Sequence, residues 1–178
     1  DRESGFEAQA VERVGTRAYG VSKVVSTAVS SFLAVTAAIV LFLGILYLGG
    51  MQELPKYPLG NSQYYALVDE GHVYLFYLVR AVITGLGAAL AGVVSMTISA
   101  FVANAYVALL APLLIYYAYW VVQSMIPHSG WFSLYAVLFG QPISHAGLSF
   151  LWSVVFLLTL IVLCGRLFLW RLRKEQGE

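Results

Sequence analysis

The sequence predicts an all-α, polytopic membrane protein in which four transmembrane helices follow a cytosolic amphipathic helix. Apolar residues make up 60% of the 178 residues and charged residues only 11%. The mean hydropathy is +0.80, which is too high for a soluble domain of this length. The apolar residues are gathered into four runs, each long enough to cross the roughly 30 Å hydrocarbon core of a bilayer as a helix.

Residues 1–23 are predicted to form a cytosolic segment that contains a short amphipathic helix. Phe6, Ala10 and Val14 recur every four residues in a stretch that is otherwise polar and charged, and this spacing is typical of one helical face. The sequence begins at Asp1 rather than at a methionine, and no signal sequence precedes the segment. We therefore expect it to be part of a longer chain.

A long helix is predicted to begin directly after Gly15. Thr16 can cap this helix, because its hydroxyl can accept hydrogen bonds from the backbone N–H groups of the next turn. No proline interrupts the sequence from there to Gly49. Residues 24–49 carry no charged side chain, so they form the first predicted span.

Three further spans complete the predicted transmembrane bundle of residues 24–170. A loop with Pro, Gly and charged residues precedes the second span, a short turn with Ser, Thr and Asn precedes the third, and a loop with Gly, Pro and His precedes the fourth. The predicted spans cover residues 24–49, 73–98, 102–126 and 148–170, and a cytosolic basic tail occupies residues 171–178.

Lys and Arg residues flank the bundle and predict its orientation. Cytoplasmic loops of membrane proteins are enriched in these residues, and an even number of spans returns the chain to its starting side. Both ends of the segment are therefore expected on the cytoplasmic side of the cell (inner) membrane. The turn between the second and third spans should then also be cytoplasmic, although it lacks basic residues. The residues that indicate this orientation are Arg2, Arg13, Arg17 and Lys23 before the first span and Arg166, Arg171, Arg173 and Lys174 at the end of the last.

Residue types that carry catalysis or bind metals form no recognisable pattern. The sequence has no phosphate-binding loop, no Ser/His/Asp order on plausible elements and no HExxH motif, so we expect neither enzymatic activity nor a cofactor in this chain. His72, His128 and His145 fall in loops on the far side. Without a carboxylate or a second histidine at ligand spacing, we favour solvated histidines over a metal site. The basic residues form no aromatic-studded stripe, which argues against nucleic-acid binding.

Arg80 lies some eight residues into the second span, which is otherwise apolar. A charge at this depth costs a few kcal/mol by insertion scales unless it reaches the interface or finds a partner. We favour a side chain that extends to the outer interface, where Tyr74 and Tyr77 precede it. The alternatives are an ion pair with Asp69 or Glu70, or a contact with cargo.

Three residues of the third span are further candidates for a transport pathway. Asn104, Pro112 and Gln123 could make a pore-lining helix polar or bend it. Each is equally compatible with ordinary packing between helices. The sequence does not decide between these interpretations.

Small residues in the second span predict a close helix contact. Gly85, Ala88, Ala89 and Gly92 recur at three- and four-residue spacing, so they share one face. Small residues let helix backbones approach each other in lipid, where packing drives association. The partner of this face is either another helix of this chain or a second copy.

The N-terminal stretch resembles the cytosolic segment of ABC transporter permeases of the second exporter type, the ABC-2-like family. In that family an acidic residue, a small residue and Gly begin a short coupling helix, and a hydroxyl and basic pair, a Tyr and a Lys then lead into the third of six membrane helices. The matching positions here are Glu3, Ser4, Gly5, Thr16, Arg17, Tyr19 and Lys23. The downstream order is also similar, including an outer membrane-dipping segment at residues 126–146. The sequence departs from the family at Phe6, where many members have Thr, and it lacks the first two membrane helices.

The resemblance implies a permease subunit of an ATP-driven exporter. Such a permease pairs with a second copy or paralogue and docks onto a cytosolic ABC ATPase, which binds ATP and Mg²⁺. Phe6, Ala10 and Val14 would supply the apolar docking face, with a polar rim around it. The residues implied to couple to the ATPase are Glu3, Gly5, Phe6, Ala10, Arg13, Val14, Arg17, Tyr19 and Lys23. The apolar, aromatic outer half weakly favours an amphipathic or lipidic substrate.

Two other functions compete with this interpretation. The chain could be a non-transporting membrane scaffold or accessory subunit, with its first helix lying on the membrane surface as a plain amphipathic anchor. A secondary transporter ranks last, because a proton or sodium site normally needs an acidic residue at the membrane midplane and the four spans contain none.

Overall fold

The computed structural model describes residues 13–49, 64, 66–69, 71–102, 104–125, 133–139 and 146–176. Within these ranges the chain is helical and has no strand. The elements are α2 (Thr16–Leu48), α3 (Ala66–Asp69), α4 (Val73–Ser99), α5 (Ala105–Ser124), α6 (Leu134–Phe139) and α7 (Ala146–Gln176). Four of them, α2, α4, α5 and α7, are long and apolar enough to cross a membrane. The prediction of an all-α, polytopic membrane protein with four spans is confirmed.

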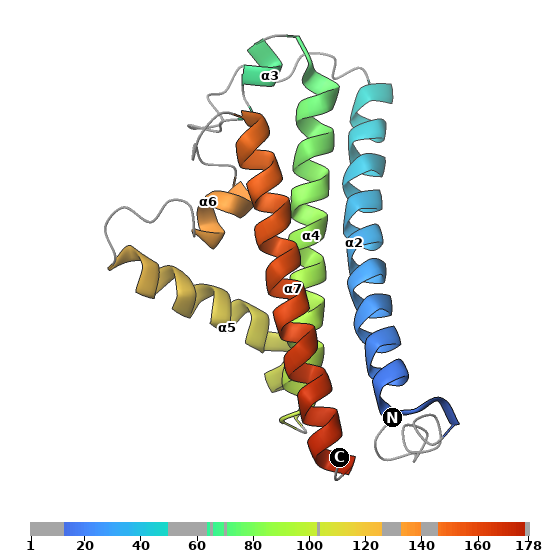
Figure 1. Ribbon diagram of the computed structural model, residues 1–178. Coiled ribbons are helices and arrows are strands. Elements are labelled where there is room, and N and C mark those ends of the chain that lie inside the picture. The colour runs from blue at the N-terminus through green and yellow to red at the C-terminus, as the bar shows by residue number, and fades with distance from the viewer. Residues whose placement is uncertain are drawn as a thin grey trace.

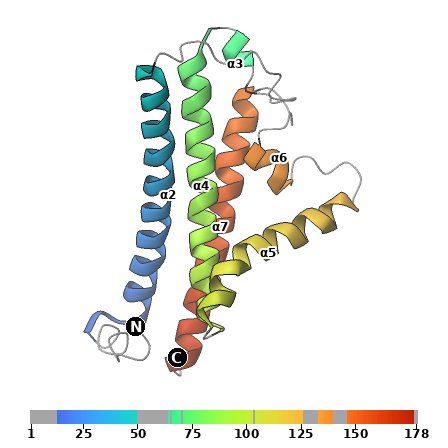
Figure 2. The same ribbon diagram turned by 180° about the vertical axis from the view of Figure 1, so that it is seen from behind.

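Three of the long helices form a bundle, and the fourth leans away from it. Figures 1 and 2 show α2, α4 and α7 side by side, and each of the three contacts the other two. From the end of the bundle where α4 stops, α5 inclines outward, and the short α6 lies near α7. The start of α2 and the end of α7 lie at the same end of the bundle (Figure 1), as an even number of spans requires.

The first span lies within a longer helix, as the sequence predicts. Helix α2 has 33 residues, which at 1.5 Å per residue makes it about 50 Å long. Its hydrocarbon-spanning part needs about 20 residues, so its first turns extend beyond the apolar core. The observed helices α4, α5 and α7 overlap the other three predicted spans, and α7 continues through Arg173 to Gln176.

The small-residue face of α4 packs mainly against α2 of the same chain. A Cβ built on Gly92 would lie 2.6 Å from Ser31 Oγ, and one built on Gly85 would lie 3.0 Å from Phe32 Cδ2 and closer still to Thr36 Oγ1. At both positions a Cβ would force the facing side chains of α2 to shift, so glycine permits this close approach. The question that the sequence left open is answered for this face: its partner is an intramolecular helix.

The neighbouring small residue of that face joins α4 to α7 as well. Ala89 is buried in a cluster with Val93 and with Ile161 of α7, and Phe32 and Cys164 are packed against the same cluster. Cys164 is a free, half-buried cysteine, so its role here is packing. The three long helices thus share one apolar seam.

A second apolar cluster holds the short helix α6 against the bundle. Tyr64, Phe76, Ile83, Val137 and Leu157 are buried together, which brings α4, α6 and α7 into contact. Of these, all but Phe76 are fully buried. Apolar packing therefore holds α6 against the bundle.

Candidate functional site

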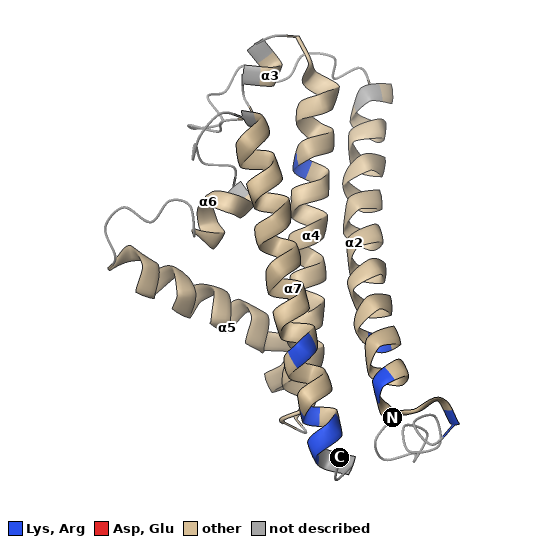
Figure 3. Ribbon diagram, viewed as in Figure 1, with Lys and Arg blue, Asp and Glu red and all other residues tan. Residues whose placement is uncertain are grey.

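The basic residues gather at the end of the bundle where the two described termini lie. Figure 3 shows this distribution: apart from Arg80 in α4, the lysines and arginines drawn in blue lie toward that end. They come from both α2 and α7, and the seven described ones are Arg13, Arg17, Lys23, Arg166, Arg171, Arg173 and Lys174. No acidic side chain in the described part of the chain neutralises them. The described side chains at this end of the bundle are therefore positively charged.

Gly15 turns the chain between the N-terminal segment and α2. Its φ is +84°, a left-handed conformation that costs other L-residues about 1–2 kcal/mol. The first hydrogen bond of α2 runs from the Tyr19 N–H to the Gly15 carbonyl at 3.0 Å, so Gly15 occupies the capping position. Thr16, for which the sequence suggested that role, is the buried first residue of the helix.

The end of the predicted docking helix is exposed beside this turn. Arg13 and Val14 are helical, and Val14 is 62% exposed. A shallow concavity of about 530 Å³ begins at Val14 and continues along the first turns of α2 to Val21, with Arg17 on its edge. An apolar notch with a cation at its edge is suited to receive a side chain from another protein.

Tyr19 and Lys23 form a local pair one turn apart on α2. The Lys23 ammonium donates a hydrogen bond to the Tyr19 hydroxyl at 3.2 Å and lies 5.4 Å from the centroid of its ring. The pair fixes both side chains where the apolar run begins. Their direct role in the structure is therefore to support this end of α2.

Arg171 of α7 secures the turn between α4 and α5. Its Nε donates to the Ala100 carbonyl at 3.5 Å, and its guanidinium lies 5.4 Å from the Phe101 ring centroid. The turn itself has no basic residue, which was the weak point of the predicted orientation. A cation from a different helix supplies the missing positive charge there.

Arg80 contacts α6 rather than lying alone on the surface of α4. Its Nη1 donates to the Leu138 carbonyl at 3.1 Å, and the residue is half-buried. The side chains of Asp69 and Glu70, the alternative partners suggested by the sequence, lie outside the described residues. The contact with Leu138, which is 58 positions away, was not foreseen.

The three candidate residues of the third span have different positions. Asn104 caps α5: its Oδ1 accepts hydrogen bonds from the N–H groups of Tyr106 at 2.9 Å and of Val107 at 3.4 Å. Pro112 lies inside α5 and Gln123 near its end, and both are half-buried. Capping accounts for Asn104, whereas a pathway role for any of the three stays a prediction.

Several predicted site residues lie outside the described part of the chain. They are Glu3, Gly5, Phe6 and Ala10 of the docking segment and the loop histidines His128 and His145. His72 is exposed at the start of α4. Among the described residues, no three His, Cys, Asp or Glu side chains are close enough to hold a metal ion.

Comparison of the chain with protein-family models, with curated proteins and with solved structures gave no match. The sequence pattern and the geometry of the end of the bundle that carries the basic residues are therefore the guides to function.

Proposed function

We propose that the chain is the membrane-spanning permease subunit of an ATP-driven ABC exporter. In this proposal its N-terminal segment docks onto a cytosolic ATPase, which holds the ATP and Mg²⁺, and the permease works with a second copy or a paralogue. Both described ends then face the cytoplasm of the cell membrane. The cargo is amphipathic or lipidic.

The observation that supports this proposal is the continuity between the N-terminal segment and α2. The segment whose sequence resembles a coupling helix ends in the exposed Arg13 and Val14 and meets α2 at the turn of Gly15. Helix α2 then runs through the depth of the bundle without a proline. A displacement of the docked segment would thus be passed directly to a long helix.

The contact between α2 and α4 would transmit that displacement to a second helix. Gly85 and Gly92 allow α2 to approach α4 closely through Phe32 and Ser31. Tightly packed interfaces of this kind move as units or shift between discrete arrangements, because they do not deform continuously. Movement of α2 would therefore move α4, which carries Arg80 and its contact with α6.

The charge distribution supports the proposed orientation. The basic residues of α2 and α7 lie at one end, and Arg171 contributes its charge to the α4–α5 turn at the same end. Positive charge near helix ends favours the cytoplasmic side. The lipidic cargo is supported by the apolar surface of α5, where Leu109, Leu113 and Tyr117 are among the exposed side chains.

Co-purification tests the proposal. The full-length protein would be affinity-purified in mild detergent from its native cells, and its partners identified by mass spectrometry and assayed for ATPase activity. We expect a stoichiometric ABC ATPase whose retention falls at least about tenfold, equivalent to 1.4 kcal/mol, in Arg13→Glu and Val14→Asp. Arg166→Glu is the matched control, because Arg166 is also an exposed cation but lies far from the docking segment along the chain.

The opposite result is a homo-oligomer without an ATPase, unchanged by Arg13→Glu. That outcome would exclude the exporter and leave the membrane scaffold. Gly5→Ala and Phe6→Ala extend the test into the docking segment, because a surface anchor tolerates substitutions that preserve its amphipathic pattern, whereas a docking element does not.

A further inference from the structure

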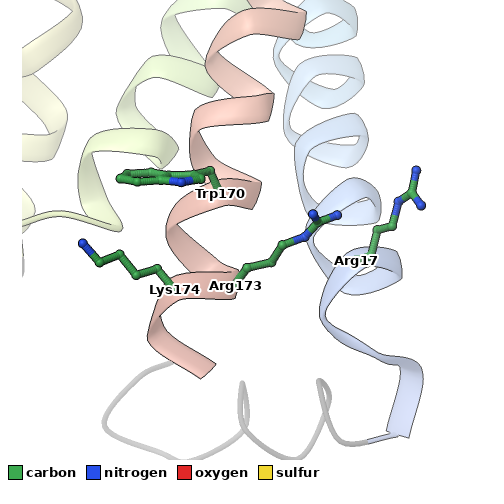
Figure 4. Close-up of a pocket in the computed structure, with 4 residues that line it drawn as sticks. All are labelled: Arg17, Trp170, Arg173 and Lys174. Carbon is green, nitrogen blue, oxygen red and sulfur yellow. The ribbon is translucent and has the colours of Figure 1, made fainter. Parts of the chain in front are cut away.

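A basic, open groove lies at the same end of the bundle, along the last turns of α7 and beside the first turn of α2. It is lined by Arg17, Trp170, Arg173 and Lys174 and has a volume of about 550 Å³. Figure 4 shows the four side chains: Arg173 extends from α7 toward α2, Trp170 and Lys174 extend to the other side of α7, and Arg17 points away from α7, so the cations are spread along an open surface. Three cations from two helices therefore border one open cavity.

The cations of this groove are not neutralised by the described part of the chain. Arg17 and Arg173 form no hydrogen bond or ion pair with any described residue, and the described contact of Lys174 is with Trp170, whose ring centroid lies 5.6 Å from the ammonium. The neighbouring Arg171 differs, since it binds the α4–α5 turn. Like charges gathered at one site repel each other, and a bound anion would relieve that repulsion.

The residues around the groove are of the types that gather at the membrane interface. The apolar run of α7 ends at Trp170, and the basic residues Arg171, Arg173 and Lys174 follow at once. Tryptophan concentrates at the membrane interface, where its ring meets the headgroups, and Trp170 is 56% exposed. On α2, the interfacial pair Tyr19 and Lys23 marks the same boundary.

The side chains suit a phosphate group in particular. Guanidinium groups bind phosphate through two parallel N–H bonds, and an ammonium binds it as a point charge. The exposed indole adds an amphipathic surface for the glycerol and upper acyl chain of a lipid. A soluble phosphate would use the cations but would gain nothing from Trp170.

We propose that this groove binds the phosphate headgroup of an anionic phospholipid. The binding surface is formed by Arg17, Arg173 and Lys174 with Trp170, and it is independent of whether the chain is an exporter. Each cation near the membrane surface contributes about 1 kcal/mol to binding of anionic lipid, which corresponds to about a fivefold change in affinity. The groove should therefore distinguish phosphatidylglycerol from the zwitterionic phosphatidylcholine.

Native mass spectrometry of the purified chain in mild detergent tests this proposal. The protein would be titrated with phosphatidylglycerol, with phosphatidylcholine and, separately, with inorganic phosphate as a competitor. We expect phosphatidylglycerol to bind at least about tenfold more tightly than phosphatidylcholine, since three cations contribute, and millimolar phosphate to leave it bound. Displacement by phosphate alone would assign the site to soluble phosphates and overturn the lipid proposal.

Matched variants separate the groove from the general charge of the molecule. Arg173→Gln should weaken phosphatidylglycerol binding about fivefold, and the double variant Arg173→Gln/Lys174→Gln about 25-fold. Arg166→Gln removes the same charge two turns earlier on α7, outside the groove, and should change binding less than twofold. Equal losses in Arg173→Gln and Arg166→Gln would overturn the proposal.

Two further readouts keep the test decisive. Arg173→Lys retains the charge without the guanidinium fork, so it should fold and bind with an affinity between wild type and Arg173→Gln. If Arg173→Gln leaves lipid binding unchanged but loses a co-purifying ATPase, the groove is a protein-docking surface and the lipid assignment is wrong. Because lipid binding is measured without the ATPase, failure of the exporter proposal would not affect this result.

Discussion

Replacing Gly85 by alanine should separate α2 from α4. The added Cβ would lie 3.0 Å from Phe32 Cδ2 and 3.1 Å from Phe32 Cε2, and closer than that to Thr36 Oγ1. Ordinary carbon contacts lie at about 3.5–4.0 Å, so either α2 must shift by several tenths of an ångström or these side chains must leave their preferred rotamers. Overpacking of this kind costs about 1–3 kcal/mol.

Gly44→Ala is the control that isolates this cost. Gly44 also lies within a long helix, but no atom is within 4 Å of a Cβ built there. Both substitutions gain the same helix propensity of about 1 kcal/mol, so the difference between their unfolding free energies is the packing cost alone. We expect Gly85→Ala to be less stable than Gly44→Ala by about 1–3 kcal/mol in unfolding titrations with SDS in mixed micelles.

A second substitution tests the geometry directly. Thr36→Ala removes the oxygen that the new Cβ would meet, so it should restore part of the stability lost in Gly85→Ala. Contacting residues typically show coupling energies of about 0.5–3 kcal/mol in such cycles. Equal stabilities of Gly85→Ala and Gly44→Ala, together with no coupling to Thr36→Ala, would refute the close contact between α2 and α4.

Three other predictions concern polar contacts of the bundle. Asn104→Ala should cost about 1 kcal/mol by removing the α5 cap, and hydrogen exchange at the first turn of α5 should speed up, whereas unchanged exchange there would contradict the capping role. The Thr97 hydroxyl shares its one hydrogen between the Val93 carbonyl of its own helix at 2.7 Å and the Cys164 carbonyl of α7 at 3.2 Å, so Thr97→Val should lose up to about 0.6 kcal/mol in the same SDS titration, and Thr97→Ser should not. Arg80→Met should raise hydrogen exchange in α6 because the donor to Leu138 is lost; a protected α6 in that variant would show that apolar packing alone holds it.

The lengths and types of the long elements could be predicted because they follow from local composition. Uninterrupted apolar runs without proline determine α2, α4 and α7, and the glycine spacing in α4 marks a packing face by itself, whatever helix lies opposite. The capping position at Gly15 was missed, because a positive φ at glycine cannot be distinguished from a simple break in periodicity. Thr16 is the stronger capping residue by type. The turn at Gly15 nevertheless makes the Gly15 carbonyl the first acceptor of α2.

The contacts between distant segments could not be predicted. Arg80 finds its acceptor on α6, and Arg171 finds its acceptor at Ala100, 71 positions away. Neither pairing has a charge partner that sequence reasoning could match, because both acceptors are backbone carbonyls. The groove at Arg17 and Arg173 also depends on distant segments. In the sequence these two residues are separate positive charges, and they line one cavity only because α2 lies beside α7.

The inclination of α5 has a consequence for the surrounding bilayer. Helix α5 has 20 residues and is about 30 Å long, the thickness of the hydrocarbon core itself. Because it leans away from the bundle (Figures 1 and 2), it covers less than that thickness along the membrane normal. The carbonyl groups of its last turn need polar partners, which hydrocarbon cannot supply. Where α5 crosses the membrane at this inclination, we expect the lipid beside it to thin toward the helix end, whereas lipid beside the longer α2 need not.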